Sequence, residues 1–95
     1  MIDIQKTFEK CQDNYLKFKD LENKLHSRPD ICAFLLIDKL LPSNNDIVSA
    51  AEHDVIYLDC DIEELSKVAT EEDILMLCKC GVIYDSDYDC LSMFV

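Results

Sequence analysis

Cysteine is the residue type with the most varied potential chemistry in this chain of 95 residues, which contains six of them. Cys78 and Cys80 form a Cys-x-Cys pair, whereas Cys60 and Cys90 stand apart from it. Structural zinc sites use two such pairs of closely spaced ligands, and side chains two positions apart on a helix point in nearly opposite directions. The spacing therefore predicts small apolar core residues, and we expect neither a metal nor a disulfide to be needed for folding.

Two other groups of polar residues have the residue types of a functional site. Asp85, Asp87 and Asp89 alternate like the first ligands of a calcium loop, but the sixth position is Cys90 instead of glycine, so a charged hairpin turn is the better interpretation. His53 lies between two carboxylates and resembles a general base. No nucleophile, phosphate-binding loop or dinucleotide motif accompanies it. The chain is therefore predicted not to be an enzyme and to have no cofactor.

The elements that position these residues begin with a predicted helix over residues 3–26, which Asp3 is suited to cap. His26 would fall in its last turn, where the helix dipole favours a cation. Apolar residues recur in it at three- and four-residue steps, which suits either self-association in a coiled coil or lengthwise packing on its own domain. The predicted self-association residues are Ile4, Phe8, Cys11, Tyr15, Phe18 and Leu25.

The middle of the chain predicts a buried helix and a short helical segment. Pro29 ends the first helix, because a proline disfavours helical backbone at the residue before it. Asp30 can cap a second helix over residues 31–41, which is apolar on nearly every side and should form the centre of the core. A loop over residues 42–45 and a short helical segment over residues 47–51 follow.

The last part of the chain predicts a strand, two short helices and a hairpin. The strand covers residues 55–58, which are β-branched and aromatic. Asp61 is suited to cap the first of the two helices and Thr70 the second, while Gly81, the only glycine, marks the second helix's end with a positive φ. Two β-rich runs on either side of residues 85–89 then form the hairpin.

These elements predict an α+β fold with a long N-terminal helix, further helices and a small, mainly antiparallel three-stranded sheet that ends in the C-terminal hairpin. The length suits one modest core, so we expect a single domain over residues 1–95, in which the helix of residues 1–26 joins an acidic α+β body of residues 30–95. The predicted core residues are Phe34, Leu35, Ile37, Leu40, Val55, Tyr57, Leu65, Ile74, Leu77, Val82 and Phe94.

Charge is distributed unevenly along the chain, whose formal net charge is −11. Residues 1–29 contain six basic and five acidic residues, whereas residues 30–95 contain fifteen acidic residues and three lysines. Such a surface repels nucleic acids and anionic membranes and attracts basic proteins. The acids gather at the starts of the two short helices and at the hairpin turn. The predicted partner-binding residues are Asp61, Glu63, Glu64, Glu71, Glu72, Asp85 and Asp87.

The end of the chain, with Gly81-Val82-Ile83-Tyr84-Asp85 and Ser92-Met93-Phe94-Val95, resembles short, acidic, uncharacterised proteins of tailed bacteriophages over about the last forty residues. That resemblance carries no agreed activity, but it implies a protein that binds and inhibits a host protein, in some cases by imitating nucleic acid. The charged N-terminus lacks the apolar stretch of a signal peptide, and the longest apolar run, residues 31–37, is too short to cross a bilayer. We therefore expect a cytoplasmic location, in the host cell if a phage encodes the chain.

Two functions follow from these observations. The first is an acidic protein-binding module that occupies a basic nucleic-acid-binding site on a host protein, with the carboxylates standing in for phosphates. The alternative is a structural or assembly protein that self-associates as a homodimer through the N-terminal helix, with acids that serve only solubility. Neither function involves direct contact with nucleic acid or a membrane.

Overall fold

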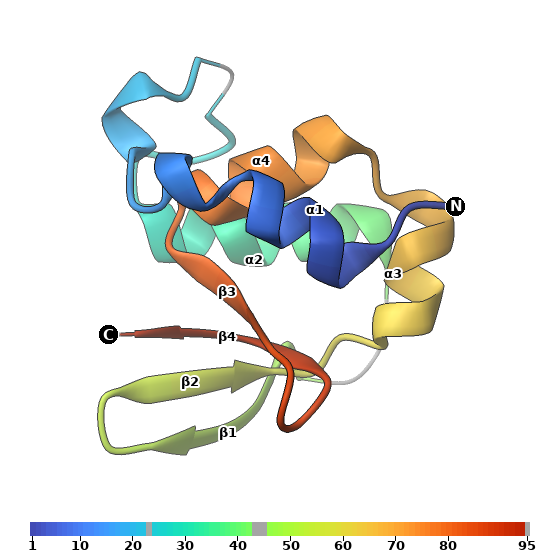
Figure 1. Ribbon diagram of the computed structural model, residues 1–95. Helices are drawn as coiled ribbons and strands as arrows, with labels where there is room; N and C mark the ends of the chain where they lie inside the picture. Colours follow the sequence, from blue (N-terminus) through green and yellow to red (C-terminus); the bar gives the residue numbers. More distant parts are fainter. Residues whose placement is uncertain (23, 43–45, 95) are drawn as a thin grey trace.

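The computed structural model describes residues 1–22, 24–42 and 46–94 and has an α+β fold, as predicted. Helices α1, α2 and α4 lie together over one face of a sheet, and α3 stands at their side (Figure 1). Two 3-10 turns, Gln12–Asn14 and Phe18–Asp20, lie between α1 and α2. The regular elements of the described residues are α1 (Ile4–Lys10), α2 (Pro29–Leu40), β1 (Val48–Glu52), β2 (Val55–Leu58), α3 (Ile62–Val68), α4 (Glu71–Lys79), β3 (Val82–Asp85) and β4 (Cys90–Phe94).

The sheet has four strands, so the prediction of three is wrong. Its order is β1-β2-β4-β3, and every neighbouring pair is antiparallel. Strand β1 takes the place of the short helical segment predicted over residues 47–51. Its alanines favour a helix by propensity, but the tight turn at His53, which has φ 55°, folds this segment back to pair with β2. Residues 43–45, predicted as part of a loop, lie outside the described residues.

The prediction of one long N-terminal helix is also wrong, because α1 ends at Lys10. Leu16 adopts φ 63°, which a right-handed helix does not allow. Its N–H donates a hydrogen bond to the carbonyl oxygen of Cys78, at 3.2 Å. This bond to the end of α4 replaces helix continuation. Tyr15 and Phe18 still pack partly buried against the core, so the apolar spacing serves a series of short turns.

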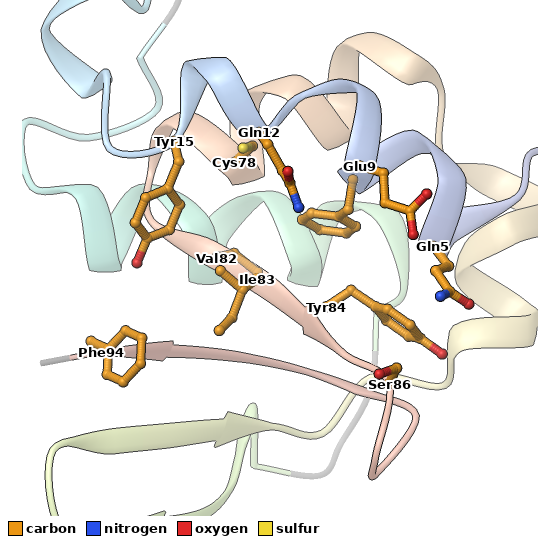
Figure 2. Close-up of a pocket in the computed structure, with 11 residues that line it drawn as sticks. Gln5, Glu9, Gln12, Tyr15, Cys78, Val82, Ile83, Tyr84, Ser86 and Phe94 are labelled. Carbon is orange, nitrogen blue, oxygen red and sulfur yellow. The ribbon is translucent and has the colours of Figure 1, made fainter.

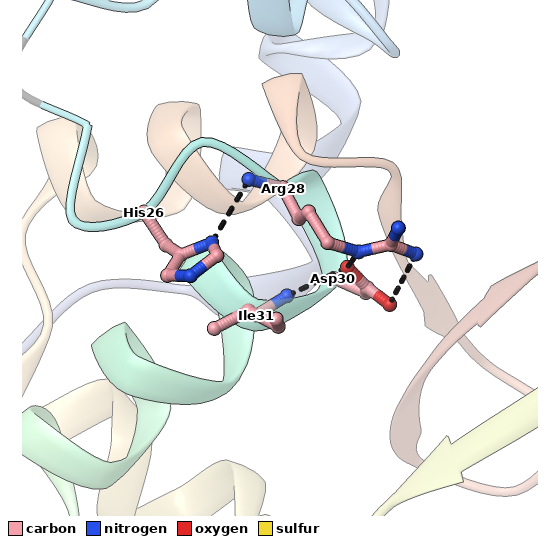
Figure 3. A network of polar contacts seen from close by, with 4 residues as sticks. All are labelled: His26, Arg28, Asp30 and Ile31. Carbon is pink, nitrogen blue, oxygen red and sulfur yellow. Dashed lines mark hydrogen bonds and ion pairs between the residues drawn. The ribbon is translucent and has the colours of Figure 1, made fainter.

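A group of polar contacts fixes the start of α2 (Figure 3). The Arg28 guanidinium lies 3.2 and 3.4 Å from the two carboxylate oxygens of Asp30, and this hydrogen bonding lowers the pKa of Asp30. Asp30 is not the helix cap that was predicted, because α2 already begins at Pro29. His26 lies in the loop before α2, not in a helical last turn, and its Nδ1 accepts a hydrogen bond from the Arg28 N–H at 3.1 Å.

The helix caps, the glycine at the helix end and the hairpin that were predicted for the last part of the chain are confirmed. Asp61 caps α3, and Thr70 and Asp73 form a reciprocal capping box at the start of α4. Gly81 follows α4 with φ 97°, a conformation that residues with a side chain rarely adopt. The predicted hairpin is present as β3 and β4, with partners that run from Val82 opposite Met93 to Asp85 opposite Cys90.

One cluster of buried side chains joins the helices to the sheet. The predicted core residues that are buried are Ile37, Leu65, Ile74, Leu77 and Val82. Those that are partly buried are Phe34, Leu40, Val55 and Tyr57. Two predictions are wrong: Leu35, on the outer side of α2, is 43% exposed, and Phe94, at the end of β4, is 59% exposed. The prediction that the cysteines are core residues is confirmed for Cys11, Cys32, Cys60, Cys78 and Cys80, which are buried, whereas Cys90 is only partly buried.

Candidate binding cleft

A cleft of about 460 Å³ runs between α1 and strand β3 (Figure 2). Its volume lies within the range of about 300–1,000 Å³ that is usual for ligand-binding clefts. Figure 2 shows Tyr15 and Phe94 toward one end and Tyr84 and Ser86 toward the other. The residues that line it are Gln5, Phe8, Glu9, Gln12, Tyr15, Cys78, Val82, Ile83, Tyr84, Ser86 and Phe94.

Helix α1 forms the first wall of the cleft. Asp3 caps this helix by accepting a hydrogen bond from the Lys6 N–H at 3.0 Å. Residues four apart lie on the same side of a helix, so Gln5 and Glu9 stand together as exposed polar groups. The amide of Gln5 can donate and accept hydrogen bonds, while the ionised carboxylate of Glu9 only accepts them. This wall is therefore polar and negatively charged.

The floor of the cleft is apolar and firmly packed. Phe8, Cys78 and Val82 are 6%, 3% and 0% exposed. The Cys78 Sγ lies 3.0 Å from the carbonyl oxygen of Cys11 and donates a hydrogen bond to it, which ties α4 to the end of α1. Burial raises the pKa of the Cys78 thiol to about 11. A thiol in this state is a packing residue, because the reactive species is the thiolate.

One end of the cleft is lined by Tyr15, which directly precedes the corner at Leu16. The Leu16 N–H is bonded to the end of α4, which holds the preceding Tyr15 in place beside the cleft. Gly81 lies directly beneath this corner: a Cβ added there would meet Leu16 Cδ2 at 2.8 Å. The left-handed conformation of Leu16 and the glycine below it therefore belong to one local arrangement that places β3 next to α1.

The hairpin turn closes the other end. The Tyr84 hydroxyl donates a hydrogen bond to Asp89 Oδ1 at 2.5 Å, and this bond raises the pKa of Tyr84 to about 12. Asp85 Oδ1 accepts hydrogen bonds from the N–H groups of Asp87 and Tyr88, at 2.9 and 3.3 Å. The alternating aspartates thus build a charged turn, as predicted, and two of the predicted partner-binding residues, Asp85 and Asp87, flank Ser86 at the cleft.

The other five predicted partner-binding residues lie away from the cleft, in two exposed groups. Asp61, Glu63 and Glu64 form the start of α3, and Asp61 accepts a hydrogen bond from the Glu64 N–H at 3.1 Å. Glu71 and Glu72 form the first turn of α4, which follows the far end of α3 (Figure 1). The structure therefore places the seven carboxylates at the starts of α3 and α4 and at the hairpin turn, the three positions that the sequence indicates.

The six predicted self-association residues do not share an outward face. Their burial falls from Ile4, Phe8 and Cys11, which are buried, through Tyr15 and Phe18, which are partly buried, to Leu25, which is 41% exposed. The buried members pack in the core of their own chain. Ile4, Phe8 and Cys11 are therefore not available to contact a second copy of the chain. Homodimer formation stays a prediction, but these six residues do not form one surface for it.

The remaining candidates for chemistry are exposed or unassembled. His53 is an exposed residue of the turn between β1 and β2. Across residues 1–22, 24–42 and 46–94, no group of three or more His, Cys, Asp or Glu side chains is arranged to hold a metal ion. The same residues include no helix of the length and apolarity that a membrane crossing requires.

Sequence reasoning missed three polar side chains that line the cleft: Gln5 and Glu9 on α1, and Gln12 in the 3-10 turn that follows it. Their spacing is visible in the sequence, but it predicts only a solvated helix face. What makes them part of a cleft is that β3 is an edge strand, and strand order is not encoded in local patterns. Comparison with known proteins found no match to this chain among protein-family models, curated proteins or solved structures.

Proposed function

We propose that this protein is an acidic protein-binding module that covers a basic, nucleic-acid-binding surface on a partner protein and thereby blocks it, in the manner of a small phage inhibitor. The observation that carries this proposal is the exposure of carboxylates at three places on the surface with few cations beside them. The starts of α3 and α4 and the β3–β4 turn all present such groups.

Ion pairing within the chain neutralises only a small part of this charge. The described residues contain three ion pairs, which use Asp30, Glu64 and Glu71. The Lys10–Glu71 and Lys67–Glu64 pairs join exposed side chains, so they hold little energy against competition from a partner's lysine or arginine. The five predicted partner-binding residues outside these pairs form no ion pair with the described residues; they are Asp61, Glu63, Glu72, Asp85 and Asp87. Their charge is therefore free to meet a basic partner.

Chemical likeness between carboxylate and phosphate supports the choice of partner. Arginine and lysine side chains that hold phosphates also hold carboxylates, and arginine does so through two parallel hydrogen bonds. Glu63 and Glu64 on one helix and Glu71 and Glu72 on the next give closely spaced negative charges, as a nucleic-acid backbone does. A protein whose basic groove binds nucleic acid is the complement that best fits this surface.

The first test is capture of partners by the immobilised chain from an extract of the organism or host cell that carries its gene, followed by a competition assay. Binding should weaken steeply between about 50 mM and about 500 mM salt, because salt screens charge-driven association. Added chain should release DNA or RNA from the purified partner. A partner that stays bound at the higher salt and keeps its nucleic acid would contradict the proposal.

A matched pair of variants makes this test specific to position. The test variant carries Glu63→Gln, Glu64→Gln, Glu71→Gln and Glu72→Gln. The control variant removes the same charge elsewhere on the surface, through Asp13→Asn, Asp20→Asn, Glu22→Gln and Asp38→Asn. We expect the first to lose partner binding while its circular dichroism spectrum stays unchanged, and the second to keep most of it. Equal loss in both would show that only the total charge matters.

A further inference from the structure

Strand β3 has a free edge. Within the described part of the chain, Val82–Asp85 pair with β4, and no backbone hydrogen bond joins them to any other segment. Successive residues of a strand direct their N–H and C=O groups to opposite edges, so alternate groups of β3 point away from β4. Unpaired edges of this kind are templates on which another strand can add.

The cleft beside α1 lies along this edge. Four strand residues extend over roughly 13 Å at about 3.3 Å per residue, and the first three residues of β3, Val82 to Tyr84, line the cleft. Its floor is apolar, at Phe8 and Val82, and its helix wall carries Glu9 and two amide side chains. An apolar floor next to free backbone groups suits an extended peptide better than a compact ligand.

We propose that β3 receives an extended segment of the basic partner as a fifth strand of the sheet, with the segment lying in the cleft between β3 and α1. The charge of the segment rests on the proposed function, whereas its strand geometry rests on the free edge alone. Val82 and Tyr84 share the sheet face that the helices cover, and Ile83 and Asp85 share the other. The segment therefore needs apolar residues toward the floor and a lysine or arginine beside Asp85.

A second copy of this chain is the competing occupant, and charge argues against it. Each copy has a formal net charge of −11, and pairing two β3 edges would bring their Asp85 and Asp87 groups and the carboxylates of both cleft walls together. A basic segment gains attraction from the same groups. The chemistry of the edge thus selects a partner of opposite sign.

The test uses two synthetic peptides with the same side chains and charge. One is acetyl-Val-Lys-Val-Lys-Val-Lys-amide, and the other is its depsipeptide, in which ester oxygens replace the internal backbone N–H groups. Calorimetry measures the affinity of each. Amide exchange followed by NMR measures protection at β3, with the other edge strand, β1, as the internal control. Sedimentation of the free chain shows whether two copies already pair.

We expect the amide peptide to bind about tenfold tighter or more than its ester analogue, since the ester cannot donate backbone hydrogen bonds. We also expect new protection at alternate residues of Val82–Asp85 and none in β1. Equal, salt-sensitive binding of both peptides would overturn strand addition and leave the proposed function standing. Absence of binding, protection in β1 instead, or a dimer that already protects β3 would each overturn the inference.

The variant Asp85→Asn tests whether a basic residue of the added segment lies beside Asp85, as distinct from general attraction between opposite charges. We expect this variant to lose about threefold in affinity for the amide peptide, because a single exposed charge pair contributes little more than that. Asp54→Asn, in the turn between β1 and β2, removes the same charge far along the sheet and should leave the affinity unchanged. Equal effects of the two substitutions would overturn the assigned position of the basic residue.

Discussion

The two edge strands of the sheet, β1 and β3, differ in regularity and in what stands beside them. The register of β1 shifts between Val48 and Ala50, and the strand continues with small, exposed side chains. The register of β3 is continuous over all four of its residues, and α1 stands beside it across the cleft. A bulge is a common way to keep an edge strand from pairing.

The contrast teaches that this chain protects its edges by two different means. At β1, irregular backbone geometry makes any added strand fit poorly. At β3 the backbone is regular, and protection depends on the helix wall and on negative charge, from Glu9 to Asp85. The first kind of protection acts against every strand, whereas the second admits a strand of suitable width and opposite charge.

Removing the packing of the helix wall should have the largest effect. Phe8→Ala removes a side chain that is 6% exposed, and we expect the free energy of unfolding in urea to fall by about 3–5 kcal/mol. Leu35→Ala, at a position that is 43% exposed, is the control and should cost less than about 1 kcal/mol. If the two substitutions lower the free energy of unfolding equally, α1 is not held in the core and does not form a rigid wall of the cleft beside β3.

The entry to β3 should be the next most sensitive point. Gly81→Ala forces a side chain into φ 97°, and we expect a loss of about 1–2 kcal/mol in the free energy of unfolding. Combining it with Leu16→Ala removes the 2.8 Å contact but not the backbone strain. Most of the loss should therefore persist in the double variant. Full recovery there would mean that the contact, and not the φ angle, requires glycine.

Removing the hydrogen bond between Tyr84 and Asp89 should have the smallest effect on stability, and this effect should fade at high pH. The hydrogen bond raises the folded-state pKa of Tyr84 from 10.0 to about 12, so the protonated hydroxyl is favoured in the folded state. The resulting stability is complete below about pH 10 and is lost as the pH rises toward 12. Tyr84→Phe should be less stable than the original chain at pH 8, and the difference in melting temperature should shrink above pH 10. A difference in melting temperature that stays constant with pH would contradict a stabilising hydrogen bond between Tyr84 and Asp89.

Local sequence signals predicted the second half of the fold well because they act over a few residues. Thr70 and Asp73 form their capping box within one turn, and Gly81 is needed for its own φ angle. The α+β class follows from such elements. The identity of β1 was not predictable in this way, because small side chains such as Ala50 fit a helix until pairing with β2 decides otherwise.

The N-terminal part and the cleft depend on contacts between distant residues. Leu16 leaves the helical conformation while its N–H bonds to Cys78, more than sixty positions later, and no pattern around Leu16 signals that bond. The same holds for Glu9, whose neighbour across the cleft is set by strand order. The sequence already assigned the seven predicted carboxylates to the starts of two helices and to the hairpin turn, but where these three places lie on the surface depends on how α3, α4 and the hairpin pack.

Alkylation of the buried cysteines can measure how readily each part of this chain opens locally. Burial raises the pKa of Cys60 and Cys80 to about 12 and that of Cys78 to about 11, so alkylating reagents meet almost no thiolate in the closed state. When closing is faster than alkylation, each thiol then reacts in proportion to the fraction of time that its own element is open. Cys90, which is only partly buried in β4, should be modified first. The order in which the others follow would rank the elements by opening free energy, without any introduced label.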